Sequence, residues 1–353
     1  MRELKIGSTI INDDSDCYVI AEVGHNHQGN LEKAKELFMA AKRAGVNAVK
    51  LQKRDNKTLF TKEAYEKPYD NPNSFGATYG AHREFLEFGW PEYKELKKFA
   101  EDLELDFFST AFDISSADFL ERLDVPAYKL ASGDLKTLPL LKHVARFGKP
   151  MIMSTGGATL NDVRRAYEAV KPINSKICFM QCTGGYPPEW HELNLLVIDT
   201  LRKEFPDIVI GFSSHDSGIA MAIAGYMLGS RIIEKHFTLN RTMKGTDHAF
   251  SLEPIGMTKM VRDLRRLKKA LGDGKKITYE SEKAPINKMG KSLVAAHSLR
   301  KGHIITEEDI KMKSPGGGIS PFEYERIVGM TLDQTMREDD FFDFAKLAEH
   351  KAK

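Results

Sequence analysis

Two histidines in the C-terminal half of the chain lie at the ends of short apolar runs that resemble buried strands. His215 directly follows the run IVIGFSS, His236 lies near the end of the run RIIEKHF, and Asp247 stands in the segment beyond. Two imidazoles on neighbouring strand ends, with a carboxylate nearby, suit a divalent transition metal. The pattern predicts that His215 and His236 bind a metal; histidines that only make hydrogen bonds are the alternative.

Two lysines lie in similar apolar runs, Lys50 in NAVKLQ and Lys129 in AYKLAS. A buried ammonium group is costly without an anionic partner, and lysine combined with hydroxyl groups is suited to phosphate. The ends of these and the other runs supply further polar side chains, among them Glu22, Gln52, Thr110, Ser132, Ser154, Ser213 and Glu234. The pattern favours a phosphate site. Two alternatives stay open: salt bridges with Glu22, Asp134 or Glu234, and a Schiff-base lysine of an aldolase.

Eight short apolar runs supply the strands that would position these side chains. They lie at residues 17–24, 47–52, 106–111, 127–132, 150–155, 176–183, 208–214 and 231–237. Runs without clean alternation are typical of parallel strands buried on both faces. Most segments between them have helical patterns; one extends from the capping residue Asn30 to Gly45.

These alternating strands and helices predict an α/β fold, a (β/α)8 TIM barrel, in which catalytic residues sit at the carboxyl ends of the strands. An open doubly wound sheet would need a GxGxxG segment after its first strand, and GHNHQGN is not one. The connection over residues 53–105 is long, and such loops are usually functional.

The pattern changes after Gly274, where short runs and Gly/Pro turns replace the strand–helix units. We therefore predict a TIM-barrel catalytic domain over residues 1–272, a linker over 273–286 and a small domain over 287–353. In the small domain, one short helix is expected near residues 321–327.

The composition is that of an ordinary globular protein. The 353 residues include 52 Lys and Arg against 50 Asp and Glu, a formal net charge of +2, which gives no electrostatic reason to expect a nucleic acid or a membrane as partner. The N-terminus has no apolar signal segment, and no run approaches the ~20 apolar residues of a membrane span. The three cysteines, Cys17, Cys178 and Cys182, form no CxxC motif. We expect free thiols and a cytoplasmic protein.

Nine segments, in order along the chain, resemble the sialic acid (N-acetylneuraminate or nonulosonic acid) synthase family. They are AEVGHNHQGNLEKA, AVKLQ, FFSTAFD, AYKLASGD, STGGAT, QCTGGYP, GFSSHDSG, EKHFT and KGTDHAFSLEP. The part from about Met289 resembles the antifreeze-like SAF domain that follows the barrel in that family. TYGAHREFLEF and KGTDHAFSLEP are closer to the animal-type branch, some members of which use 6-phosphorylated sugars.

The resemblance implies a transferase of carbohydrate biosynthesis that condenses phosphoenolpyruvate with a hexose-derived aldehyde sugar and releases phosphate by C–O cleavage. The sugar would be an N-acylmannosamine or a mannose-type sugar, with or without a 6-phosphate. The resemblance also implies a divalent metal on His215 and His236, typically Mn²⁺, with Mg²⁺ or Co²⁺ as substitutes. It further implies a homodimer in which the SAF domain completes the neighbour's site.

By position, the resemblance gives roles to the other site residues. Glu22 would contact the reacting centre and handle a proton, while Tyr186 and Asp247 would meet the sugar. The phosphate and carboxylate of phosphoenolpyruvate would be held by Lys50, Lys129, Ser132, Ser154 and Ser213, with Gln52 and Thr110 assisting.

Two positions depart from the family pattern. Gly184 stands where bacterial members tend to have Asn, and Ser314 stands where their SAF loop has an arginine that reaches the N-acyl group. A serine lacks the bidentate donor fork of arginine, so we expect a tolerant sugar pocket. Candidate partners for a sugar phosphate are Arg83, His82, Lys244 and Lys288.

Two other functions stay open from the sequence. One is a related phosphoenolpyruvate-dependent synthase of a shorter keto-deoxy sugar acid, although the SAF-like domain argues against it. The other is a non-catalytic carbohydrate-binding barrel, against which the set of Glu22, the two lysines and the two histidines argues.

Overall fold

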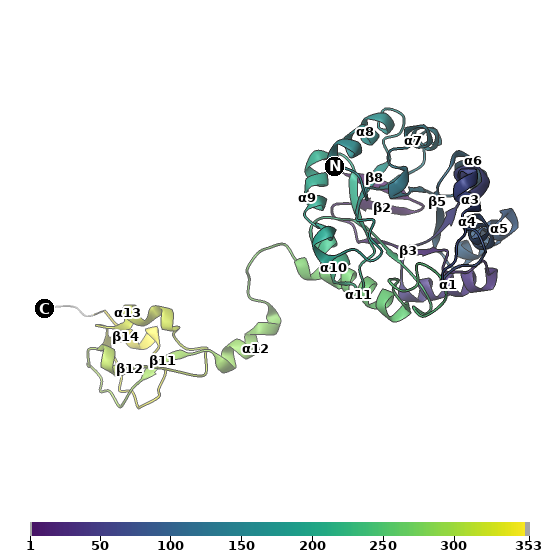
Figure 1. Cartoon of the computed structure of the whole chain (residues 1–353). Coiled ribbons are helices and arrows are strands. Elements are labelled where there is room, and N and C mark those ends of the chain that lie inside the picture. The colour runs from purple at the N-terminus through teal and green to yellow at the C-terminus, as the bar shows by residue number, and fades with distance from the viewer. Residues whose placement is uncertain (1, 350–353) are drawn as a thin grey trace. The chain divides into compact units, whose positions relative to one another are not determined.

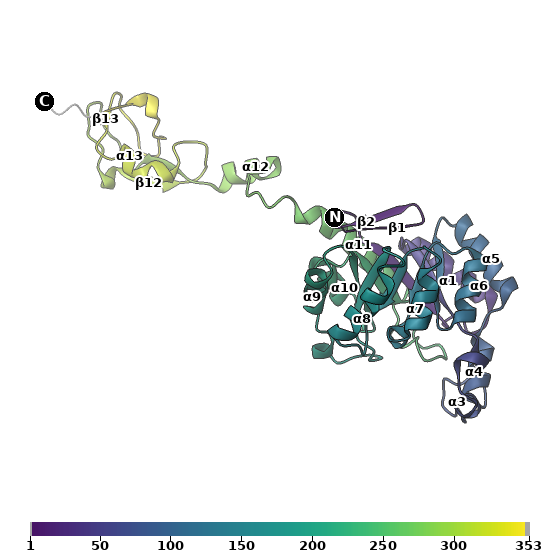
Figure 2. The same cartoon turned by 90° about the horizontal axis from the view of Figure 1, so that it is seen from above.

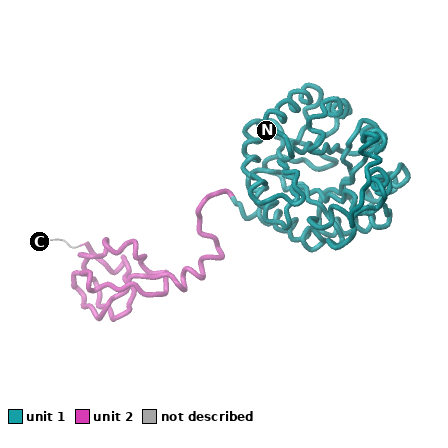
Figure 3. Tube along the Cα trace, viewed as in Figure 1, with its two compact units in different colours: residues 1–272 teal, residues 273–353 magenta. Residues whose placement is uncertain are grey.

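The chain forms two compact units, residues 1–272 and residues 273–353 (Figure 3). The computed structural model describes residues 2–349. Among these residues, no helix combines the length and the apolar character needed to cross a membrane.

The first unit is built around a closed barrel of parallel strands with helices on its outside (Figure 1). The strand order runs from β3 to β10 in chain order, and β10 pairs with β3 to close the ring. The strands are β3 (Tyr18–Gly24), β4 (Ala48–Lys53), β5 (Asp106–Ala111), β6 (Tyr128–Leu130), β7 (Met151–Ser154), β8 (Ile177–Cys182), β9 (Val209–Ser214) and β10 (Ile232–His236). Each lies within or largely overlaps one of the predicted runs, so the predicted TIM barrel is confirmed.

The barrel helices begin and end where local chemistry favours it. They are α1 (Leu31–Ala44), α5 (Trp90–Asp102), α6 (Ile114–Leu123), α7 (Leu138–Ala145), α8 (Leu160–Val170), α9 (Val197–Glu204), α10 (Ala220–Met227) and α11 (Pro254–Leu271). Asn30 caps α1 by accepting the Lys33 N–H at 2.9 Å, and Gly45 ends the helix with a φ of +83°. The predicted helix limits are therefore confirmed here.

Fully buried strands explain why the apolar runs do not alternate. All residues of β3 and β8 are buried, because one face packs inside the barrel and the other against the helices. The interior and the helix layer together form one large apolar core. This rigid frame fixes where the strands end and therefore where the polar side chains lie.

The long connection between β4 and β5 carries three short helices of its own before α5. They are α2 (Asn56–Leu59), α3 (Lys62–Glu66) and α4 (Tyr79–Leu86). Figure 2 shows α3 and α4 projecting from one end of the barrel, while a hairpin of β1 (Glu3–Ile6) and β2 (Thr9–Asn12) lies at the other end. This hairpin was not expected from the sequence.

The second unit has a small core of its own. The described residues of this unit form two antiparallel strand pairs, β11 (Ser292–Ala295) with β12 (Ile310–Lys313) and β13 (Thr331–Leu332) with β14 (Leu347–Ala348). The predicted short helix is α13 (Tyr324–Ile327), preceded by a 3₁₀ turn. Residues 273–286, predicted as a linker, include the first part of helix α12 (Glu280–Met289), all of it exposed or half-buried.

Candidate active site

A cavity of about 430 Å³ lies at the carboxyl ends of the barrel strands. All twelve site residues expected from the sequence line it: Glu22, Lys50, Gln52, Thr110, Lys129, Ser132, Ser154, Tyr186, Ser213, His215, His236 and Asp247. The structure therefore brings the complete set together. The chemical role of each residue stays a prediction.

Strand register explains why the charged residues meet. Glu22 on β3 lies beside Lys50 on β4 and beside His236 on β10. The Lys50 Nζ is 2.6 Å from the Glu22 Oε2 and donates to the Thr110 Oγ1 at 2.7 Å. Gln52, two residues along the same strand, donates its Nε2 to the Glu22 Oε1 at 2.7 Å. Glu22 is thus held on both carboxylate oxygens.

Lys129 and Glu234 form the second half of this charged cluster. The Lys129 Nζ donates to the Ser154 Oγ at 2.6 Å and lies 3.8 Å from the Glu234 Oε1. The same Glu234 oxygen is 3.9 Å from the Lys50 Nζ and accepts from the Ser213 Oγ at 3.3 Å. The two lysines and two glutamates therefore form one buried network.

In this network, lysine–glutamate salt bridges and a phosphate site, which the sequence left as alternatives, are compatible. The lysines do pair with Glu22 and Glu234, as the salt-bridge interpretation expected, yet both also line a cavity rich in hydroxyl groups. In the described part of the chain, Asp134 makes no ion pair with either lysine. An anionic ligand would therefore find two ammonium groups already fixed in position.

The two glutamates differ in acidity. Burial raises the pKa of Glu22, against the lowering influence of Lys50. Burial also raises the pKa of Glu234, but Lys129 and Lys50 outweigh it and hold this pKa below its usual value. Two carboxyl groups whose pKa values are pushed apart suit different tasks. Glu22 is the group suited to carry a proton, and Glu234 stays ionised beside the lysines.

His215 and His236 are neutral neighbours with ring centroids 5.3 Å apart. Burial, followed by the nearby His236, lowers the pKa of His215 to about 4, and burial lowers the pKa of His236. A hydrogen bond of 3.0 Å joins the His215 Nδ1 to the Thr183 carbonyl, so this nitrogen carries the proton and the Nε2 keeps its lone pair.

The donor atoms at this site include a nitrogen that is free to bind a metal. The buried Nδ1 of His236 has no hydrogen-bond partner and lies 3.7 Å from the Asp247 Oδ2. Two neutral imidazoles, one with an unpartnered nitrogen, fit a divalent metal. Among residues 2–349, no group of three or more His, Cys, Asp or Glu side chains is arranged to hold an ion. The protein alone thus offers two strong donors, and water or substrate oxygens would have to supply the rest.

Tyr186 and Asp247 lie on the more open side of the cavity. The Tyr186 ring, 59% exposed, packs against His215 at a centroid distance of 4.0 Å. Burial raises the pKa of Asp247, but His236 and a hydrogen bond from Thr246 outweigh it, so the net pKa is lowered. An ionised carboxylate and an exposed aromatic face are groups that bind sugar hydroxyls and sugar rings.

Several lining residues were absent from the expected set. Glu234, Arg54, Phe112 and Cys182 all face the cavity. Glu234 was noted as a possible lysine partner, and Arg54 follows Lys50 and Gln52 at intervals of two, which places all three on one face of a strand. That periodicity was a usable signal for Arg54, since Lys50 was already identified.

Of the four candidates for binding a sugar phosphate, only Arg83 lines the cavity. His82 is buried in α4 and accepts the Phe75 N–H at 3.1 Å. The Lys244 Nζ lies over the Phe75 ring, 4.9 Å from its centroid. Lys288 belongs to the second unit.

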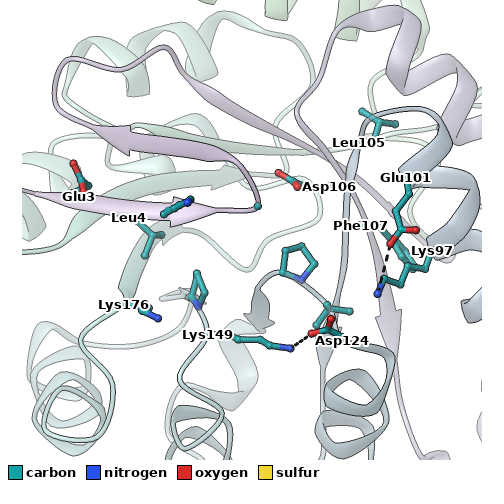
Figure 4. A pocket seen from close by; sticks show the side chains of 15 residues that line it. Glu3, Leu4, Lys97, Glu101, Leu105, Asp106, Phe107, Asp124, Lys149 and Lys176 are labelled. Carbon is teal, nitrogen blue, oxygen red and sulfur yellow. Dashed lines mark hydrogen bonds and ion pairs between the residues drawn. The ribbon is translucent and has the colours of Figure 1, made fainter.

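A second cavity, of about 670 Å³, lies beneath the β1–β2 hairpin, at the amino ends of the barrel strands (Figure 4). Figure 4 shows Lys149 paired with Asp124 and Lys97 paired with Glu101. Because it lies away from the strand ends that carry catalytic groups, and Lys97 and Lys149 already have carboxylate partners, this cavity is not a candidate active site.

Comparisons with known proteins agree with the geometry. Residues 37–276 match the NeuB family, and residues 290–348 match the SAF domain. The N-acetylneuraminate-9-phosphate synthase of Homo sapiens is 39% identical over 325 residues, 92% of this chain and 90% of that protein. The N,N'-diacetyllegionaminic acid synthase of Campylobacter jejuni is 35% identical, covering 91% of this chain and 97% of that protein.

A solved structure shows the same likeness. The crystal structure of N-acetylneuraminic acid (sialic acid) synthetase from Leptospira borgpetersenii, in complex with citrate, superimposes with a TM-score of 0.70 at 31% identity. It covers 81% of this chain, and 95% of that chain is matched. With both units matched and the expected site residues gathered in one cavity, the chain belongs to the sialic acid synthase (NeuB) family, in which a TIM barrel is followed by a SAF domain.

Proposed function

We propose that this enzyme makes a nonulosonic acid by condensing phosphoenolpyruvate with the aldehyde group of an N-acylmannosamine or a mannose-type sugar. The relatives are named as synthases of N-acetylneuraminate 9-phosphate and of N,N'-diacetyllegionaminic acid, so they differ in the sugar. One observation carries the proposal: Lys50 and Lys129 open into the same cavity as Glu22, His215 and His236.

Phosphoenolpyruvate carries a phosphate and a carboxylate, and the buried part of the cavity offers groups that bind both. The lysines supply two ammonium groups, and Ser132, Ser154 and Ser213 supply hydroxyls. Gln52 and Thr110 assist indirectly, because their hydrogen bonds hold Glu22 and Lys50 in position. The positions of these groups are set before the ligand arrives, which lowers the entropic cost of binding.

The proposed reaction forms one C–C bond and one C–O bond to water, and it breaks the C–O bond between carbon 2 and the phosphate. Carbon 3 of phosphoenolpyruvate attacks the aldehyde carbon of the open-chain sugar, and the aldehyde oxygen takes up a proton. Water adds to carbon 2 and loses a proton. Inorganic phosphate then leaves carbon 2 as the new hydroxyl group loses its proton and becomes the keto group. Glu22 is suited to carry one of these protons because burial raises its pKa. Holding both reactants in one cavity is itself worth ~7 kcal/mol in good cases.

We further propose that His215 and His236 hold a divalent metal, with Mn²⁺ as the expected ion and Mg²⁺ or Co²⁺ as substitutes. The support is the donor set: neutral imidazoles, one with a buried nitrogen that lacks a hydrogen-bond partner. Such an ion, when bound, polarises the aldehyde carbonyl as a Lewis acid. The protein's part is to keep both imidazoles unprotonated and oriented.

The sugar is expected to lie between Tyr186 and Asp247. A side chain added at Gly184 would meet no atom within 4 Å, so the chain is open at this position. Ser314 donates to the Met289 carbonyl within the second unit and cannot supply an arginine's donor fork. Both features support a pocket that tolerates sugars with and without an N-acyl group.

A homodimer whose SAF domain completes the neighbour's site is part of the proposal. Its support is the SAF domain itself, matched over residues 290–348. We also propose that the enzyme works in the cytoplasm, where its three cysteines, all buried, stay as free thiols.

Phosphate release from phosphoenolpyruvate tests the function. Purified enzyme with Mn²⁺ is given N-acetylmannosamine, mannose, the 6-phosphate of each, or a di-N-acetylated dideoxy hexose. We expect release with at least one, loss of release in Lys50→Met, and retention in Lys176→Met, a control at an exposed lysine whose ammonium group donates to the Gly148 carbonyl at 2.8 Å. If none of these sugars gives release, four- and five-carbon sugar phosphates are tried, and release only with those would indicate a shorter keto-deoxy acid synthase. No release with any sugar would indicate a carbohydrate-binding barrel.

A further inference from the structure

Two arginines and a histidine form a cluster at the active-site cavity that the reaction above does not use. Arg54 directly follows β4, Arg83 lies on α4 in the long connection, and His25 follows β3. Both arginines line the cavity. The Arg54 Nη1 lies 3.2 Å from the His25 Nε2, and the Arg83 Nη1 lies 3.2 Å from the His25 Nδ1. A single imidazole therefore stands between two guanidinium groups.

This cluster has more hydrogen-bond donors than acceptors. Arginine only donates, and a neutral imidazole has one acceptor nitrogen and one N–H. Burial, together with Arg54 and Arg83, lowers the pKa of His25 well below its usual value, so the ring is neutral. Whichever tautomer is present, one guanidinium N–H faces another N–H. An acceptor with several oxygens would remove this conflict.

The other hydrogen-bond partners of the two guanidinium groups are uncharged, and the carboxylates of Glu87 and Asp247 act on Arg54 only from a distance. The Arg54 Nη2 donates to the Gln52 Oε1 at 2.7 Å, and its Cζ lies 3.6 Å from the centroid of the Phe112 ring. Arg83 donates to the Tyr79 hydroxyl from its Nε at 3.0 Å and its Nη2 at 2.7 Å. Within residues 2–349, none of these bonded partners is a carboxylate. Arg54 is only 7% exposed, so its charge lacks both bulk water and a directly bonded counter-ion.

The cluster is also separate from the lysine site. Lys50, Gln52 and Arg54 share one face of β4 and its extension, and four residues of strand span ~13 Å. Lys50 is buried against Glu22 and Glu234, whereas Arg54 lies just past the end of the strand. The cavity therefore has two cationic regions, and one phosphoenolpyruvate molecule in the lysine site leaves the second region free.

We propose that the Arg54–His25–Arg83 cluster binds a phosphate group at the end of the sugar that is opposite its aldehyde. This inference rests on the proposed function. With the aldehyde near Glu22 and His236, the far end of the sugar points away from the lysine site, and a phosphate monoester supplies the acceptor oxygens that the two planar donor forks lack. Adding three carbons at the aldehyde of a hexose 6-phosphate gives a nine-carbon acid 9-phosphate, the product for which the human relative is named.

The test compares N-acetylmannosamine 6-phosphate with N-acetylmannosamine as substrates. For each, kcat/KM and the KM of phosphoenolpyruvate are measured for the wild type, Arg83→Met, Arg83→Lys and Arg262→Met. Arg262 is an exposed control on α11 whose guanidinium pairs with the neighbouring Asp263 at 2.7 Å. We expect the wild type to prefer the phosphorylated sugar and Arg83→Met to lose that preference by about 10- to 100-fold, the value of one charge-assisted bond or fork. Arg83→Lys should lose less, and Arg262→Met should keep the preference.

Three outcomes would overturn the inference. The first is a wild type without preference for the phosphorylated sugar, and the second is an Arg83→Met variant with unchanged preference. The third is an Arg83→Met variant in which the KM of phosphoenolpyruvate rises equally with both sugars. In the last case the guanidinium serves phosphoenolpyruvate. If Arg83→Met unfolds at a clearly lower temperature, the preference of Arg83→Lys decides instead. Turnover of N-acetylmannosamine alone would refute this site and leave the proposed function intact, whereas no turnover with any sugar would refute the proposed function itself.

Discussion

Replacing Glu234 by glutamine probes the charged network most directly. The side chain keeps its shape but loses its charge, while Lys50 and Lys129 stay buried. The Glu234 Oε1 is 3.9 Å from one Nζ and 3.8 Å from the other. With an effective dielectric constant of about 20, each attraction is worth about 4 kcal/mol. The variant also avoids the cost of burying a carboxylate, which is several kcal/mol. We therefore expect a net loss of about 3 kcal/mol in the free energy of unfolding.

The loss should depend on pH with a definite sign. Burial lowers the pKa of Lys129, and Glu234 opposes this by favouring the charged form. Without Glu234 the folded-state pKa of Lys129 falls further below the unfolded value of 10.5. Between these two values the unfolded chain binds more protons than the folded one, so stability rises with pH. The deficit of Glu234→Gln should therefore shrink as pH is raised from neutral towards 10.

Urea unfolding of the wild type and Glu234→Gln, from pH 6.5 to 9.5, measures both effects. Glu204→Gln is a matched control, since Glu204 pairs with Arg164 on the surface and such pairs contribute about 1 kcal/mol or less. Phosphoenolpyruvate should stabilise the variant more than the wild type, because its negative charge takes the place of the lost carboxylate. A loss below about 0.5 kcal/mol with no pH dependence would refute the idea that Glu234 holds the lysines charged.

Three further predictions concern neighbouring parts of the site. His236→Ala should fold normally but lose at least ~100-fold in turnover, without recovery at high Mn²⁺, as checked by phosphate release and circular dichroism; full activity would remove the metal assignment. Deleting residues from 287 onwards should abolish turnover while the barrel's unfolding midpoint stays within a few degrees, and a truncated chain of normal activity would refute the shared site. Gly24→Ala should lower the free energy of unfolding by about 1–2 kcal/mol, because the φ of Gly24 is +52°. The new Cβ would also stand 3.2 Å from the Glu22 Oε1 and from the Gln52 Nε2. Unchanged stability and turnover would show that the end of β3 adjusts to the Cβ without cost.

The gathering of polar residues at the strand ends could be predicted, because the strands themselves follow from the local sequence pattern. A polar residue that ends a fully buried run must reach solvent or a cavity, and the barrel places all such ends on one rim. This is why Lys50, Lys129 and His236, on three different strands, could be grouped without coordinates. The prediction depended on chain order and burial alone.

Pairing between these residues could not be predicted, because it depends on register. Strand β3 shifts register between Glu22 and Gly24, and nothing in the sequence marks that bulge apart from the glycine. Glu234 was recognised as a possible lysine partner, yet its shared contact with Lys50 and Lys129 follows from how three strands are offset in the closed ring. Local periodicity contains no information about that offset.

Residues brought in by the long connection were the hardest to predict. Arg83 lies nearly thirty residues beyond Arg54 in sequence, yet both contact His25. The hairpin at residues 3–12 was missed for a different reason, because its strands are only four residues long and its turn glycine, Gly7, looks like any other. Short elements carry too few residues for a period to be recognised.

The network around Glu22 would link anion binding to the proton that we propose this carboxyl group carries. Without a ligand, Lys50 at 2.6 Å offsets much of the cost of burying the Glu22 carboxylate, and burial still raises its pKa. A phosphoenolpyruvate anion that shares Lys50 weakens this support and adds negative charge nearby, and both changes raise the pKa of Glu22 further. Binding of the anion should therefore favour the protonated acid. Glu22 would then hold a proton at the stage when the aldehyde oxygen needs one. Giving up that proton would leave a carboxylate that is able to accept the proton lost by the water.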